Sequence, residues 1–184
     1  MAETERIHWS RHGTTALLAA LAGLLVLQGA GELRRAKLVD AGEVAPPLSG
    51  KTLEGASFEL SALRGQAVIL SFWTTWCPSC QREMPVLVSL AKEYRERGMV
   101  VVAANPISQD PEEAVVGVTI SGLAPDRPDN VQVIRASDET LDDYSAHSFP
   151  TTYVLSREGR VVESFRGLAS ESSLRDAVER ALRR

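Results

Sequence analysis

The feature that most constrains this fold is an apolar run that ends just before a pair of cysteines. Residues 67–73 read Ala-Val-Ile-Leu-Ser-Phe-Trp without a charge, which is typical of a strand buried on both faces of a sheet. Cys77-Pro78-Ser79-Cys80 follows, and proline is favoured in the first turn of a helix because its missing N–H costs nothing there. The sequence therefore predicts a buried strand that turns into a helix with Cys77 at its N-terminus.

The rest of the chain predicts an α/β fold. A second apolar strand after the helix, at residues 99–104, would complete a strand–helix–strand unit with a parallel pair. A final amphipathic helix is expected near the C-terminus, with Ser170 as its cap. The other expected elements are an early hairpin at 48–60, a helix at 111–123, a strand at 131–134, a short helix at 138–146 and a hairpin at 151–155 and 161–165.

The first thirty residues have the pattern of an export signal or a membrane anchor. Arg6 and Arg11 precede an uncharged apolar run at 16–27, which is short for a span of about 20 residues. An uncleaved anchor is favoured over a cleaved signal, and the alternative is a buried helix of the domain itself. Positive charge before the run predicts that the rest of the chain lies away from the cytoplasm. The expected organisation is a signal or anchor at 1–30, a polar linker at 31–45 and one domain at 46–184.

Composition excludes several functions. The formal net charge of −4 argues against a nucleic-acid partner, which would require a basic patch. The chain has two cysteines, three positions apart. A disulfide between them cannot stabilise the fold in the way that disulfides between distant parts of a chain do. Their role is therefore chemistry or metal binding.

The position of the pair favours chemistry. Unpaired N–H groups and the helix dipole would stabilise a thiolate on Cys77, which is the attacking species in disulfide exchange. Cys80, one turn inward, would resolve the mixed disulfide. The alternatives are half of a zinc site and a passive disulfide. Zinc is disfavoured because no second cysteine pair exists and the histidines are His8, His12 and His147, so neither a metal nor a cofactor is expected.

Residues 71–80, together with Glu83-Met84-Pro85, resemble the active-site segment of thioredoxin-like proteins. The resemblance is strongest to the extracytoplasmic, membrane-anchored branch of TlpA, ResA and the cytochrome c maturation thioredoxins, which is related to the AhpC/TSA redoxins. It runs from residue 46 to the C-terminus, with 111–130 loosely matched. It implies a thioredoxin-like fold, in which helices flank a central mixed β-sheet, with an N-terminal hairpin extension and an N-terminal anchor or signal.

The resemblance also implies a second part of the site. Phe149-Pro150-Thr151 is similar to the signature in which the proline is cis and faces the redox pair. The backbone of Phe149 would then pair with a substrate chain, and Trp76, Pro78 and Thr151 would contribute substrate contacts. The alternative is an ordinary loop proline before a strand.

Three further side chains bear on the site. Glu83 stands where this branch has an acid near the cysteines, and a carboxylate there can raise a thiol pKa or relay protons. Ser71 occupies the place of the buried aspartate of cytoplasmic thioredoxins, so Glu83 is the expected substitute, and the alternative is a solvated helix glutamate. His147 is expected at the surface. Trp73 is expected in the core and Trp76 partly exposed.

The function that this resemblance implies is reduction of protein disulfides on the outer side of a bacterial inner membrane, or in secreted form if the segment is cleaved. The implied substrates are apocytochrome c or proteins of metalloprotein assembly, and the implied electron donor is a membrane thiol transporter of the DsbD or CcdA type. An oxidase or isomerase of the same fold is an alternative, although residues 105–130 are too short for a DsbA-type helical insertion. A second alternative is a Cu(I)-binding module that uses Cys77, Cys80 and His147. A third alternative is hydroperoxide reduction.

Overall fold

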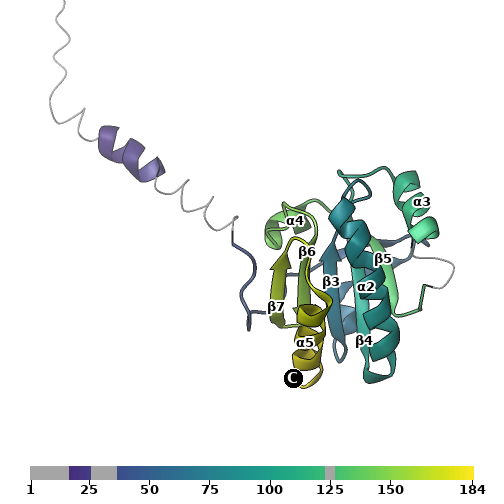
Figure 1. The fold of residues 1–184 in the computed structure, drawn as a ribbon. Helices are drawn as coiled ribbons and strands as arrows, with labels where there is room; N and C mark the ends of the chain where they lie inside the picture. Colours follow the sequence, from purple (N-terminus) through teal and green to yellow (C-terminus); the bar gives the residue numbers. More distant parts are fainter. Residues whose placement is uncertain (1–16, 26–36, 123–126) are drawn as a thin grey trace, which may run out of the picture. The chain divides into compact units, whose positions relative to one another are not determined.

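The computed structural model describes residues 17–25, 37–122 and 127–184. Two compact units divide the chain, 1–37 and 38–184. In the first, residues 17–25 are helical (Figure 1), and the leucines among them are exposed. Within the described residues, no helix combines the length and the apolar character needed to cross a membrane. The rest of the predicted signal or anchor, 1–16 and 26–30, lies outside the described residues.

The second unit contains a seven-stranded sheet in the order β2-β1-β5-β4-β3-β6-β7. Its three central strands, β5, β4 and β3, are parallel neighbours, and the outer strands pair antiparallel. The mixed sheet and the early hairpin are therefore confirmed, and the hairpin extends the sheet through β1. The strands are β1 Ser49–Thr52, β2 Ser57–Glu59, β3 Ala67–Phe72, β4 Met99–Pro106, β5 Val131–Ala136, β6 Thr151–Leu155 and β7 Val161–Arg166.

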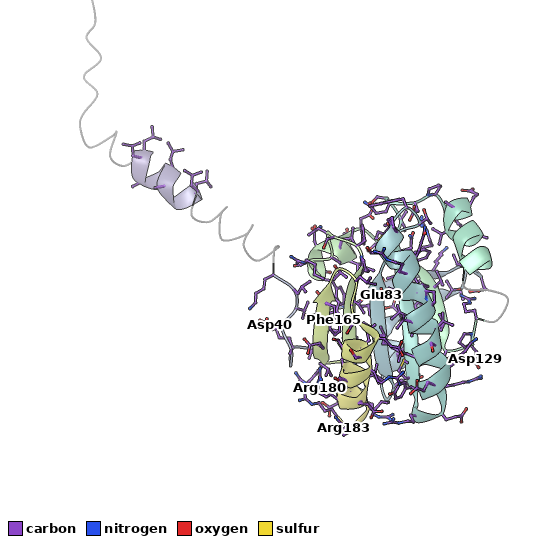
Figure 2. All side chains as sticks on the ribbon, in the orientation of Figure 1. Asp40, Glu83, Asp129, Phe165, Arg180 and Arg183 are labelled. Atoms are coloured by element: carbon purple, nitrogen blue, oxygen red, sulfur yellow. A yellow bond between two sulfur atoms is a disulfide. The ribbon has the colours of Figure 1, made fainter. Side chains whose placement is uncertain are left out.

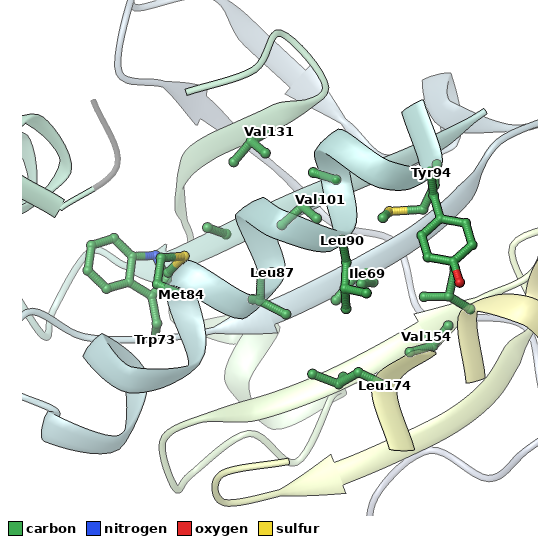
Figure 3. Close-up of a cluster of buried hydrophobic side chains, with 14 of the residues drawn as sticks. Ile69, Trp73, Met84, Leu87, Leu90, Tyr94, Val101, Val131, Val154 and Leu174 are labelled. Carbon is green, nitrogen blue, oxygen red and sulfur yellow. The ribbon is translucent and has the colours of Figure 1, made fainter. Parts of the chain in front are cut away.

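Helices cover both faces of this sheet (Figure 1). Apolar side chains of α2 and α5 pack with Ile69 and Val101 on one face (Figure 3), and α3 adds to the same cluster. On the other face, α4 and a short 3₁₀ helix, η1, pack with Val68 and Leu70. Alternate residues of the fully buried β3 thus belong to the two halves of the core, as its apolar run predicts. The helices are η1 Leu60–Leu63, α2 Pro78–Tyr94, η2 Arg95–Arg97, α3 Glu112–Gly122, α4 Glu139–Asp143 and α5 Glu171–Leu182.

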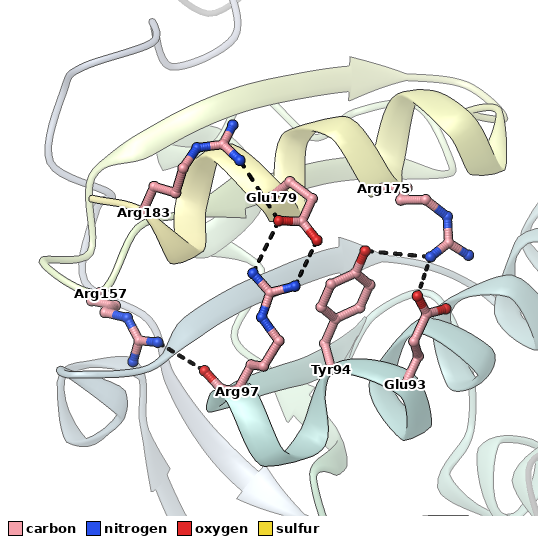
Figure 4. Close-up of polar contacts among 7 residues, drawn as sticks. All are labelled: Glu93, Tyr94, Arg97, Arg157, Arg175, Glu179 and Arg183. Atoms are coloured by element: carbon pink, nitrogen blue, oxygen red, sulfur yellow. Dashed lines mark hydrogen bonds and ion pairs between the residues drawn. The ribbon is translucent and has the colours of Figure 1, made fainter.

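A group of charged side chains joins the end of α2 to α5 (Figure 4). The ring of Tyr94 lies between two guanidinium groups, 5.1 Å from that of Arg97 and 5.9 Å from that of Arg175. Arg97 donates both of its Nη groups to Glu179, at 2.6 and 3.0 Å, and this pairing lowers the pKa of Glu179 to about 2. Because the side chains of these ion pairs are between a third and a half exposed, the pairs contribute little to stability, whereas the Tyr94 ring between them is buried.

The segment before the first strand packs on the domain. Val44 forms a β-bridge with Arg160, and the Gly42 N–H donates to the Val161 carbonyl at 2.7 Å. The Tyr144 hydroxyl donates to the carbonyl of Pro46 at 2.6 Å. Residues 38–45, which the polar composition placed in a linker, therefore lie against the sheet, because backbone pairing with a distant strand leaves no mark on composition.

Gly50 marks a point of close approach between β1 and β5. A Cβ atom on Gly50 would lie 2.3 Å from the backbone carbonyl oxygen of Arg135, and backbone cannot swing aside as a side chain does. We expect Gly50→Ala to lower the free energy of unfolding by about 1–3 kcal/mol, the usual cost of overpacking, in chemical denaturation. Gly117→Ala is the matched control, because a Cβ there meets nothing within 4 Å. Equal stability of the two variants would contradict the close packing of β1 on β5.

Candidate active site

The two cysteines form a disulfide at the start of α2. Their Cα atoms are 5.3 Å apart, and both residues are buried. Cys77 is the N-cap of α2, and its Sγ accepts a hydrogen bond from the Cys80 N–H at 3.1 Å. The same N–H and the helix dipole would stabilise a thiolate once the disulfide is reduced. The place of Cys77 at the N-terminus of α2 is therefore confirmed, and its role as the attacking sulfur stays a prediction.

The loop before β6 lies beside the cysteine loop. The Phe149–Pro150 peptide bond is cis, as the resemblance implies. Thr151, the first residue of β6, pairs with Phe72 at the end of β3, from which the chain continues to the cysteines. The rings of Trp76 and Phe149 meet edge to face, with their planes at 82° and their centroids 6.0 Å apart. The sheet thus brings together the two predicted parts of the site.

The two tryptophans and His147 take the predicted environments. Trp73 is buried and Trp76 is 59% exposed, so Trp76 presents an apolar surface beside the cysteines. Pro78 is exposed at the first position of α2. His147 is exposed, and its Nε2 lies 3.4 Å from a carboxylate oxygen of Asp142. Within the described part of the chain, no group of three or more His, Cys, Asp or Glu side chains is arranged to hold a metal ion.

Glu83, on α2 (Figure 2), is buried among polar partners from two strands and from the loop before α5. Its side chain is on α2 and the residue is 1% exposed. The hydroxyls of Ser71, on β3, and Thr152, on β6, lie 3.1 and 3.0 Å from its Oε2, and the Ala169 N–H donates to Oε1 at 3.3 Å. The alternative of a solvated helix glutamate is therefore wrong.

The environment of Glu83 favours its protonated form. Burial raises the pKa of this carboxyl above its ordinary value, although the hydrogen bonds from Ala169, Thr152 and Ser71 act in the opposite direction. Helical spacing places Glu83 one turn beyond Cys80, on the face of α2 that packs on the sheet. A buried group that exchanges a proton so near a thiol can influence thiol ionisation or pass a proton.

A second buried carboxylate, which the sequence analysis missed, supports the loop before Cys77. Asp110 is 4% exposed and accepts hydrogen bonds from the backbone N–H and the hydroxyl of Thr75, at 2.9 and 2.5 Å. Asn105, near the end of β4, donates to the same carboxylate at 2.7 Å. The available signal was the asparagine itself, a polar residue at the end of an otherwise apolar buried strand.

Comparison with known proteins agrees with this geometry. The family model described as "AhpC/TSA family" matches residues 41–178. Thiol-disulfide oxidoreductase ResA of Halalkalibacterium halodurans is 35% identical over 143 residues, which are 77% of this chain and 77% of that protein. Thioredoxin-like protein YneN of Bacillus subtilis is 32% identical over 142 residues, 77% of this chain and 80% of that protein.

Solved structures show the same architecture. A putative thiol:disulfide interchange protein DsbE from Chlorobium tepidum superposes with a TM-score of 0.68 at 25% identity, covering 78% of this chain and 99% of that one. A second thioredoxin family protein from Chlorobium tepidum gives a TM-score of 0.65 at 26% identity, covering 78% and 99%. The expected thioredoxin-like fold is therefore confirmed.

The raised pKa of Glu83 predicts how stability depends on pH. At low pH the carboxyl is protonated in both the folded and the unfolded chain. Above the ordinary value of 4.5, the unfolded chain loses this proton first, so the folded state binds more protons and is destabilised as pH rises through the raised pKa. In Glu83→Gln this pH-dependent loss should disappear. As pH rises from 4.5 to the raised pKa, the free energy of unfolding of Glu83→Gln relative to wild type should therefore increase by up to about 1.4 kcal/mol per pH unit.

Denaturation of the oxidised protein at a series of pH values measures this difference. The exposed Glu139→Gln is the matched control and should follow the wild-type curve. If the free energy of unfolding of Glu83→Gln and that of wild type changed with pH in parallel, the buried carboxyl would not retain its proton above the ordinary pKa, and the prediction would be wrong.

Proposed function

The chain belongs to the AhpC/TSA family and is a thiol–disulfide oxidoreductase, and we propose that it reduces protein disulfides on the outer side of a bacterial inner membrane. The family membership follows from the match over most of the chain and from the ResA relatives. The proposal adds the direction of the reaction, the location and the substrates.

In the proposed reaction, the Cys77 thiolate attacks one sulfur of a substrate disulfide. A mixed disulfide forms, and the other substrate sulfur leaves as a thiolate that takes up a proton. The Cys80 thiolate then attacks the Cys77 sulfur, which releases the second substrate thiolate and forms the Cys77–Cys80 disulfide seen here. Two electrons pass to the substrate, which gains two protons once both of its thiolates are protonated.

The single observation that carries the reducing direction is the buried Glu83. A strong oxidant has a reduced form that is stabilised, chiefly through its thiolate. When it is ionised, the Glu83 carboxylate, one turn from Cys80, opposes a second negative charge in the same site and so disfavours the thiolate form. The disulfide form is then relatively stabilised, which makes the dithiol a better electron donor. Glu83 would also give up or accept the proton that accompanies thiol ionisation.

The proposed substrate contacts surround the redox pair. The exposed indole of Trp76 and the ring of Phe149 offer apolar surface to an unfolded chain that carries the disulfide. Pro150 in the cis form presents the backbone of Phe149 for pairing, and the exposed Pro78 completes the rim. The expected contact from the Thr151 side chain is wrong, because Thr151 is fully buried and its hydroxyl donates to the carbonyl of Ser148 at 2.6 Å. Apocytochrome c and proteins of metalloprotein assembly are the proposed substrates, since their cysteines must be reduced before they bind haem or metal.

The N-terminal segment supports the location. Arg6 and Arg11 precede the apolar run, and the described helix at 17–25 exposes leucines that favour an apolar environment. A compartment that oxidises thiols requires dedicated reductants. A membrane thiol transporter of the DsbD or CcdA type would return electrons to the Cys77–Cys80 disulfide from the cytoplasm.

The reduction potential of the Cys77–Cys80 couple tests the direction. We expect a value near the thioredoxin end of the scale, about −270 mV, when the domain is equilibrated with glutathione and dithiothreitol buffers. A value near −120 mV, as in strong oxidants, would mean that the protein donates disulfides and that the direction is reversed. Glu83→Gln should make the potential less negative.

Trapping tests the roles of the two cysteines. Cys80→Ala should accumulate a mixed disulfide between Cys77 and an apocytochrome c whose haem-binding cysteines are oxidised, because the resolving thiolate is missing. Cys77→Ala should form none, and Ser79→Ala, which alters the same turn without removing sulfur, should turn over as wild type does. The trapped species is measured by non-reducing electrophoresis and mass spectrometry. Full turnover by Cys80→Ala would contradict the two-cysteine mechanism.

A further inference from the structure

The loop that leads into Cys77 depends on side chains from other parts of the fold. Between the end of β3 and the start of α2, residues 73–77 belong to no helix or strand. Within this loop, the Thr75 N–H and hydroxyl both donate to the Asp110 carboxylate, at 2.9 and 2.5 Å. The Trp76 indole N–H donates to the Gln109 carbonyl at 3.4 Å, next to Asp110 in the chain. The segment that follows β4 therefore holds the two residues that precede Cys77.

Asp110 is itself held by a buried hydrogen-bond chain. A buried carboxylate is costly unless its oxygens are hydrogen-bonded. Besides the two bonds from Thr75, Asn105 donates its Nδ2 to Asp110 at 2.7 Å and to the Trp73 carbonyl at 3.2 Å. Asn105 thus links the Asp110 carboxylate to Trp73, the first residue of the loop that leads into Cys77.

Arg135 of β5 supplies the outer part of this chain. Its Nη1 donates to the Asn105 Oδ1, which leaves the asparagine amide in one orientation with its Nδ2 toward Asp110. Its Nη2 donates to the main-chain carbonyl of Asp110 at 2.6 Å and to that of Ile107 at 3.2 Å. The guanidinium therefore fixes both the asparagine and the backbone that carries the carboxylate.

We infer that Asp110, held by Asn105 and Arg135, is a positioning residue of the redox site that sets the loop carrying Cys77 and contributes a fixed negative charge beside it. It acts through Thr75, since none of its hydrogen bonds reaches a sulfur. The inference depends on the exchange chemistry of the cysteine pair alone, and it holds whether the protein reduces or oxidises its substrates.

The negative charge has a predictable effect. Asp110 opposes formation of a second anion at Cys77, two residues beyond its partner Thr75. Removing the carboxylate should therefore favour the Cys77 thiolate and, with it, the dithiol form. In the sheet, β3 lies between β4 and β6. Asp110 follows β4 and would act on the redox pair from that side, whereas Glu83 contacts β6 and acts from the other side.

The test compares variants at both ends of the contact in the full chain. In Asp110→Ala we expect the equilibrium constant with glutathione to move about tenfold toward the dithiol, about 30 mV for this two-electron couple, with a larger thiolate fraction of Cys77 at neutral pH. Thr75→Val, which loses the hydroxyl, should change the same equilibrium constant at least threefold. Thr75→Ser, which retains the hydroxyl, should match wild type. The thiolate is measured by its ultraviolet absorbance.

A structural control separates positioning from folding. Asn130 donates its Nδ2 to the carbonyls of Ala91 and Met99, both at 2.8 Å, at the opposite end of β4. Asn130→Ala should lower the melting temperature and leave the equilibrium constant within twofold of wild type. If Asp110→Ala does not fold, the comparison of Thr75→Val with Thr75→Ser carries the test. Equilibrium constants within twofold of wild type for the folded Asp110 and Thr75 variants would overturn the inference.

Discussion

Burial of strand β3 on both faces is the constraint on which the rest of the structure depends. Its alternate side chains enter the two halves of the core, so neither a shift nor a rotation of the strand is tolerated. Because β3 is fixed, the place at which the chain leaves the sheet and begins α2 is fixed as well. Cys77 therefore lies just beyond the C-terminal end of β3. The C-terminal end of the parallel neighbour β4 and the N-terminal end of the antiparallel neighbour β6 pair with that end of β3.

Two buried carboxylates lie on either side of this strand, and they are satisfied in different ways. Glu83 has two hydroxyls and one N–H as partners and no cation, so its burial raises its pKa. Asp110 has an N–H, a hydroxyl and an amide, with Arg135 one step behind the amide. The negative charge of Asp110, and that of Glu83 when it is ionised, opposes a thiolate, while the start of α2 favours one. The balance between these effects sets how readily the cysteine pair gives up electrons.

Several parts of the structure were predictable because their signals are local. The uncharged run before Cys77 predicted a buried strand, and Pro78 predicted the helix start. Glycine favours the left-handed conformation, and Gly98 takes it with φ 75° where η2 ends. Ser170 caps α5 by accepting from the Ser173 N–H. The cis bond at Pro150 came from the family resemblance, since nothing in the local sequence distinguishes a cis proline from a trans one.

The sequence by itself determined the order of strands and helices, the redox pair and the presence of an acid one turn beyond it, because these depend on neighbours in the chain. Only the tertiary structure decided that Glu83 meets Ser71 and Thr152, and that Asp110, 35 residues after Thr75, holds the cysteine loop. It likewise decided that residues 38–45 lie against the sheet. The physical reason is that a buried polar group must find its partners in space, and sequence spacing does not specify which distant donor the fold will bring to it.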